Sequence, residues 1–189
     1  MSRSDALARL LERLDACGIP RMVVGSFAST ALGEYRTSAD LDIVIDPTLQ
    51  QLKRLLEALQ PEYYVDVGTA LQALESHGMF NVIDLKLGWK TDLIVRKDRP
   101  YSELEFRRRL RIEHEGLSVE ISSAEDTILS KLEWNKLSGS LLQRRDAVSV
   151  AVAQWKSLDL PYLRRWALSL GIVESVDEVL EQARRIVEP

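Results

Sequence analysis

The stretch that decides the fold spans residues 23–46 and reads VVGSFASTALGEYRTSADLDIVID. A short apolar run enters a turn at Gly25-Ser26, and a segment of small residues follows that turn. A second apolar run then begins with two carboxylates. The order predicts a strand, a tight turn, a short helix and a second strand.

The two carboxylates, Asp40 and Asp42, alternate with the apolar residues Leu41, Ile43 and Ile45. On a strand, this period of two sends the aliphatic side chains to one face and both carboxylates to the other. Like charges held this close repel each other unless a proton or a cation intervenes. Mg²⁺ takes oxygen ligands and is commonly shared between carboxylates and substrate phosphates. The pattern therefore predicts metal-dependent chemistry on phosphates, and a solvated strand face is the alternative.

The turn at Gly25-Ser26 precedes a predicted helix, where backbone N–H groups and the positive end of the helix dipole suit a phosphate. Neither a P-loop nor a Gly-x-Gly-x-x-Gly dinucleotide motif is present. Taken alone, a Gly-Ser pair is typical of ordinary turns, so this turn gains meaning only together with the acidic strand that follows it.

Composition narrows the class of protein. The chain has 189 residues, 46% of them hydrophobic and 29% charged, with a net charge of −4. This balance is ordinary for a globular protein, and it disfavours broad electrostatic binding of nucleic acid without excluding it. Cys17 is the only cysteine, and neither a membrane span nor a secretory signal is evident. We therefore expect a cytoplasmic protein that does not enter a membrane.

Apolar periodicity predicts an α/β (α+β) fold with a mixed β-sheet, flanking helices and a C-terminal helical region. The change in character near Ser122 places the α/β core at residues 1–122 and the helical region at 123–189. Expected strands or hairpins span 21–24, 41–45, 63–65, 79–96 and 110–121; expected helices span 4–17, 26–33, 48–60, 67–76, 101–109, 123–137, 143–155, 159–170 and 173–187.

The Gly25-Ser26 turn, the short helix and the Asp40-x-Asp42 strand together resemble the signature of the nucleotidyltransferase superfamily, which has the DNA polymerase β-like fold. Residues 20–100 carry this resemblance, and residues 123–132 and 162–166 extend it toward small bacterial members of toxin–antitoxin and phage-defence systems. The resemblance implies transfer of a nucleoside monophosphate from an NTP such as ATP. It also implies two Mg²⁺ ions held by three carboxylates.

The resemblance assigns Asp40 and Asp42 as catalytic metal ligands and requires a third carboxylate from the hairpin at 79–96. Two residues qualify, Asp84 and Asp92. The expected pattern is a lone acid just inside a strand and followed by aliphatic residues, which Asp92 fits better. Asp84 stays the alternative.

Further nucleotide or phosphate ligands are expected beside these acids. Gly25 and Ser26 would donate from the turn, and Arg36, Ser38 and Lys131 are the remaining candidates. Arg36 and Ser38 are equally compatible with turn and capping roles, whereas a lysine in the position of Lys131 is more typical of an exposed helix face.

Two other functions compete with an active transferase. One is a catalytically silent nucleotide-binding protein of the same fold that acts as an antitoxin-like regulatory partner. The other is RNA binding by the arginines of residues 107–111, which the acidic net charge disfavours. The sequence leaves the hydroxyl acceptor open: it is a small molecule, a protein or RNA.

Overall fold

The computed structural model describes residues 3–33 and 41–188. The chain divides into two compact units. The described part of unit 1 comprises residues 3–24 and 41–121, and that of unit 2 comprises 25–33 and 122–188. The chain thus enters unit 2 at Gly25, returns to unit 1, and enters unit 2 again at Ser122.

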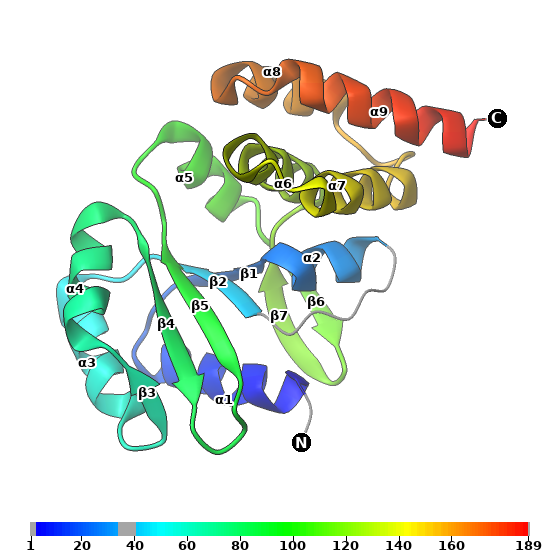
Figure 1. Ribbon diagram of the computed structural model, residues 1–189. Coiled ribbons are helices and arrows are strands. Elements are labelled where there is room, and N and C mark those ends of the chain that lie inside the picture. The colour runs from blue at the N-terminus through cyan, green and yellow to red at the C-terminus, as the bar shows by residue number, and fades with distance from the viewer. Residues whose placement is uncertain (1–2, 34–40, 189) are drawn as a thin grey trace. The chain divides into compact units, whose positions relative to one another are not determined.

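Unit 1 contains, among its described residues, a mixed sheet of seven strands in the order β3-β4-β5-β2-β1-β7-β6 (Figure 1). The central strands pair in both senses, since β1 is antiparallel to β2 whereas β2 is parallel to β5. The strands are β1 (Arg21–Val24), β2 (Leu41–Ile45), β3 (Tyr63–Val65), β4 (Met79–Asp84), β5 (Lys90–Val95), β6 (Leu110–His114) and β7 (Leu117–Ile121). Its helices are α1 (Arg3–Ala16), α3 (Leu49–Leu59), α4 (Val67–Ser76) and α5 (Pro100–Arg107). The mixed sheet with flanking helices confirms the predicted fold class.

Alternation sets the two faces of this sheet. In β2, Leu41, Ile43 and Ile45 are fully buried, while the residues between them are half-buried. In β5 the residues paired with Ile43 and Ile45, Leu93 and Val95, are buried as well. These aliphatic side chains form the apolar face of the sheet, whose burial is the main favourable term in folding.

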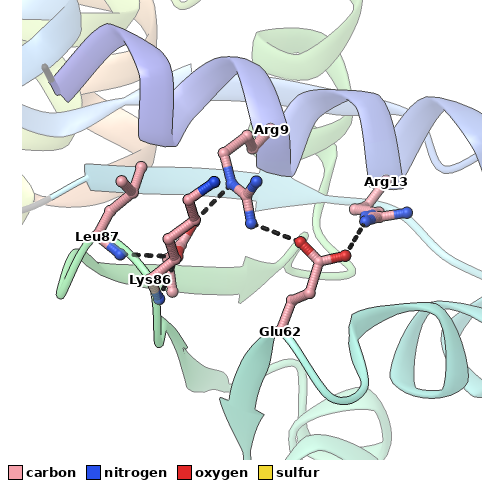
Figure 2. A network of polar contacts seen from close by, with 6 residues as sticks. Arg9, Arg13, Glu62, Lys86 and Leu87 are labelled. Atoms are coloured by element: carbon pink, nitrogen blue, oxygen red, sulfur yellow. Dashed lines mark hydrogen bonds and ion pairs between the residues drawn. The ribbon is translucent and has the colours of Figure 1, made fainter. Parts of the chain in front are cut away.

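A network of ion pairs joins helix α1 to the C-terminal end of β4 on the apolar face of the sheet (Figure 2). Arg9 Nε lies 2.9 Å from Asp84 Oδ2, and Arg9 Nη2 lies 2.6 Å from Glu62 Oε2. Arg13 binds the other oxygen of Glu62 at 2.6 Å. The backbone N–H groups of Lys86 and Leu87 donate to Asp84 Oδ1 at 2.9 and 3.0 Å. Asp84 therefore joins a helix, a strand end and the following turn.

This network makes the stability of unit 1 sensitive to acid. Burial raises the pKa of the Asp84 carboxyl, but the hydrogen bonds from Arg9, Leu87 and Lys86 outweigh burial and leave the pKa below its ordinary value. A carboxyl with a lowered folded-state pKa stabilises the protein at pH values above its unfolded-state pKa, about 3.9 for Asp. We expect that contribution to disappear as the pH falls below about 4 through the lowered pKa.

Urea unfolding at pH 5 and at pH 3 measures this effect. The free energy of unfolding should fall between these pH values by a larger amount in the wild type than in Asp84→Asn, which has no carboxyl to protonate at this position. An equal fall in both proteins would show that Asp84 does not contribute to the acid sensitivity.

Unit 2 is helical throughout its described residues and contains α2 (Gly25–Leu32), α6 (Ala124–Ser138), α7 (Leu141–Ala153), α8 (Leu160–Leu170) and α9 (Val173–Val187). Helix α2 packs against α6 and α7. A side chain at Gly33 would meet Ser149 Oγ and the backbone of Ser29 at 3.0 Å, and Gln154 Nε2 donates to the carbonyl of Leu32 at 2.9 Å. The lack of a side chain at Gly33, directly after α2, thus permits a close approach to α7.

Helix α6 begins at a polar cap. Ser123 Oγ accepts the N–H of Asp126 and donates to the carboxylate of that residue, and Tyr162 of α8 donates to the same carboxylate at 2.6 Å. This arrangement satisfies the first turn of α6 and joins it to α8. Across 3–33 and 41–188, no helix has the length and apolarity that crossing a bilayer requires.

Candidate functional site

Two carboxylates lie side by side on the face of the sheet opposite the apolar face. Asp42 of β2 and Asp92 of β5 are direct partners in the parallel register. Paired residues on neighbouring strands, about 4.8 Å apart, project to the same side. Both residues are half-buried, whereas their sequence neighbours Leu41, Ile43, Thr91 and Leu93 are buried on the opposite face. We call Asp42 and Asp92 the carboxylate pair.

Asp92 is held by two further residues of the same hairpin. Asn81 of β4, its direct antiparallel partner, donates Nδ2–H to Asp92 Oδ1. Lys90, two residues earlier on β5, places Nζ 3.1 Å from Oδ1 and 3.3 Å from Oδ2. The side chain of Asp92 is 14% exposed and that of Lys90 is 45% exposed. A cation and an amide donor therefore already contact this carboxylate.

Asp84, the alternative third carboxylate, lies on the other face of the sheet. It is three residues beyond Asn81 on β4, so its side chain projects away from the carboxylate pair. Its oxygens accept from Arg9, Lys86 and Leu87, and its side chain is 3% exposed. The geometry thus favours Asp92 over Asp84 as a metal ligand.

The turn at Gly25-Ser26, where the chain first enters unit 2, has a backbone conformation that favours glycine. Gly25 has φ of +65°, a conformation that residues with a Cβ rarely adopt. Ser26, the next residue of α2, is buried at 6% exposure, and its Oγ has no hydrogen-bond partner among the described residues. A buried hydroxyl without a partner costs free energy, so this Oγ suits a ligand that accepts a hydrogen bond.

Lys131 lies in the interior of unit 2. Its Nζ is 2.9 Å from Asp146 Oδ2, and the two side chains are 7% and 8% exposed. The pair joins α6 to α7. The ammonium group therefore has a buried carboxylate partner, and binding of phosphate by Lys131 stays a prediction.

Three of the predicted residues, Arg36, Ser38 and Asp40, lie outside the described residues. Within the described ranges, no group of three or more histidine, cysteine or acidic residues is placed to hold a metal ion. The carboxylate pair supplies two hard oxygen ligands, and these fit a divalent cation such as Mg²⁺.

Two of the arginines of residues 107–111 have identified partners within unit 1. Arg107 pairs with Glu103 one helical turn earlier. Arg109 Nε lies 3.3 Å from Glu120 Oε2, and its guanidinium stacks 4.6 Å from the centre of the Phe106 ring. These contacts give two of the arginines structural roles.

Asn81 and Lys90 are not among the residues predicted from the sequence. The alternation of side chains on β5 could have predicted that Lys90 lies beside Asp92, because residues two apart on a strand project to the same face. The same alternation indicates that Asp84 lies on the buried face of β4, because it shares that face with the apolar residues Phe80 and Val82. Asn81 required the hairpin register, which pairs it with Asp92.

No protein-family model matches the chain, and neither does any curated protein. Among solved structures it is similar to an antigenic nucleotidyltransferase-like protein from Paracoccidioides brasiliensis, with 17% identity, a TM-score of 0.59, and coverage of 94% of this chain and 91% of that one. It is also similar to ANT(2″)-Ia in complex with adenylyl-2″-tobramycin, with 14% identity, a TM-score of 0.61, and coverage of 90% and 98%.

A third similar structure is the lincosamide antibiotic adenylyltransferase LnuA with bound lincomycin, at 11% identity and a TM-score of 0.54, covering 79% of this chain and 96% of that one. The three structures share a fold with this chain at low sequence identity. The chain therefore has the nucleotidyltransferase fold, which confirms the fold that the sequence resemblance implied.

Proposed function

We propose that this protein is a Mg²⁺-dependent nucleotidyltransferase, which moves a nucleoside monophosphate from an NTP to a hydroxyl group of an acceptor. The observation that carries the proposal is the in-register pairing of Asp42 with Asp92 on one face of the sheet. Two adjacent carboxylates offer hard oxygen ligands to a divalent cation. The nucleotidyltransferase fold of the chain supports the same reaction class.

In this proposal Asp42 and Asp92, together with Asp40, are the catalytic carboxylates that hold the metal. Two bound Mg²⁺ ions would supply charge neutralisation at the triphosphate and lower the pKa of the attacking hydroxyl. The residues of the chain fix the ligand geometry, so positioning and electrostatics carry the rate without a covalent intermediate.

The phosphates of the NTP would be bound by the turn at Gly25. The positive φ of Gly25 and the unpartnered, buried Oγ of Ser26 support donation to an anionic oxygen at the N-terminus of α2. Arg36 and Ser38 are the further proposed phosphate ligands, and Lys131 is a weaker candidate because Asp146 already binds its ammonium group.

For the acceptor we propose a small hydroxylated molecule. Two of the similar structures align with most of this chain and contain a small molecule of this kind. The structure of ANT(2″)-Ia contains adenylyl-2″-tobramycin, and that of LnuA contains lincomycin. ATP is the proposed nucleotide, because LnuA is described as an adenylyltransferase and ANT(2″)-Ia as a complex with adenylyl-2″-tobramycin.

Removing the metal should abolish both tight nucleotide binding and transfer. Incubation of the wild type with each α-³²P-labelled NTP, excess MgCl₂ and a panel of aminoglycosides and lincosamides should label one acceptor class. An excess of EDTA should suppress labelling to background, because the triphosphate charge is then not neutralised.

Two results separate this proposal from its competitor. Failure of every NTP to bind in equilibrium dialysis with Mg²⁺ would overturn the proposal. Metal-dependent binding without transfer to any small molecule, protein or RNA acceptor would instead support the catalytically silent, antitoxin-like regulator of the same fold.

A further inference from the structure

The ammonium group of Lys90 contacts both oxygens of Asp92, at 3.1 and 3.3 Å. These are the oxygens that a metal ion at the carboxylate pair would use. Asn81 donates to Oδ1 as well, so among the residues that the structure describes Oδ2 has fewer contacts than Oδ1. Lys90 is therefore placed where it acts on the same atoms as the proposed metal.

We propose that Lys90 is a determinant of metal affinity, which competes with the divalent cation for Asp92 and so limits how tightly the site binds metal. The inference rests on the proposed function, because it concerns the proposed metal ligands. Lys90 is a positioning residue in this account. It acts through Asp92 and not on the nucleotide.

Electrostatics gives the direction of the effect. The ammonium offsets the charge of Asp92 and thereby lowers the repulsion between Asp92 and Asp42 in the absence of a divalent cation. Once a divalent cation is bound, the same ammonium repels it from a few ångströms away. Lys90 thus stabilises the protein without metal and weakens the binding of metal.

The alternative is an ordinary surface ion pair, which contributes little and has no effect on a ligand. The environment of Asp92 speaks against this, because its side chain is only 14% exposed and it also accepts the amide of Asn81. A carboxylate that is largely shielded from water responds more strongly to a nearby charge than an exposed one does.

Mn²⁺ binding, followed by the loss of the free-ion EPR signal, tests the proposal without relying on activity. Lys90→Met should bind Mn²⁺ at least about tenfold more tightly than the wild type, because a water-like dielectric gives the lower limit of the repulsion between a divalent cation and a nearby ammonium group. Lys90→Arg keeps the charge and should stay within about threefold of the wild type, a difference below 1 kcal/mol.

Lys86→Met is the matched control. Lys86 is exposed and lies in the turn of the same hairpin, where its backbone N–H donates to Asp84 on the opposite face of the sheet. This variant removes the same charge without touching Asp92, so its Mn²⁺ affinity should change less than about twofold. Lys90→Gln is measured as well, which keeps the comparison intact if the methionine variant fails to fold.

Thermal unfolding gives a second readout. In EDTA, Lys90→Met should melt at a lower temperature than the wild type, and saturating Mn²⁺ should raise its midpoint more than that of the wild type. The proposal is overturned if both neutral variants bind Mn²⁺ within twofold of the wild type or more weakly. A wild type that binds no Mn²⁺ would instead overturn the proposed metal site itself.

Discussion

Replacing Asp92 with asparagine is expected to lower the rate of nucleotidyl transfer by about 10³-fold and to leave the protein folded. The substitution keeps the size of the side chain but removes a charged metal ligand, and metal ions stabilise the transition state of such reactions by several kcal/mol. Asp92 is half-buried and its side chain faces Asp42, so loss of its charge also relieves a repulsion. The initial rate of labelled NMP transfer at saturating Mg²⁺ and NTP measures the effect.

Asp84→Asn is the matched control for this experiment. It makes the same chemical change in the same hairpin but on the opposite face of the sheet, where Arg9 would lose a charged partner. We expect a loss of about 1–3 kcal/mol in the free energy of unfolding and a transfer rate per folded molecule close to that of the wild type. Equal losses of transfer in both variants, or full transfer by Asp92→Asn, would contradict the assignment of Asp92 as a ligand.

The second large effect concerns stability. Lys131→Met should destabilise the protein by about 3–5 kcal/mol, because it leaves the charge of Asp146 buried without its ammonium partner. Both side chains are less than one-tenth exposed, and the pair joins α6 to α7 in the interior of unit 2. The free energy of unfolding, obtained from urea denaturation at pH 7, measures this loss.

The double variant Lys131→Met/Asp146→Asn provides the control. It removes both charges, and we expect it to recover most of the stability that the single variant loses, as the replacement of whole buried ion pairs generally does. A small loss of stability in the single variant, together with weaker NTP binding, would instead favour the predicted role of Lys131 in phosphate binding. In that case Lys131→Met would change the free energy of unfolding by less than about 1 kcal/mol and raise the KM for the NTP.

The order and type of the elements followed from local patterns. In β2, the alternation of aliphatic residues with Asp42 fixed both the strand and the face of the carboxylate, because successive side chains of a strand point to opposite sides. The small residues after Gly25 predicted a short helix, and the change in character near Ser122 predicted a helix from about residue 123, close to the observed bounds of α2 and α6. Such features depend on neighbours a few residues away, so a single sequence contains them.

The local strand pattern already favoured Asp92 over Asp84, but the partners that distinguish the two carboxylates are distant in the sequence. Arg9, 75 positions away from Asp84, binds that carboxylate from α1, and the parallel register of β2 with β5 places Asp92 beside Asp42. The burial of Lys131 also could not be read from its own helix, because its partner Asp146 lies on another helix.

The sequence by itself determined the secondary structure, the class of fold and one acidic strand with its preferred face. The tertiary structure alone decided which segments cover which side chains, and hence that Asp84 pairs with Arg9, that Lys131 is buried, and that Asn81 and Lys90 contact Asp92. The physical reason is that alternation and helix caps are local, whereas burial and ion pairing depend on where distant segments of the chain pack.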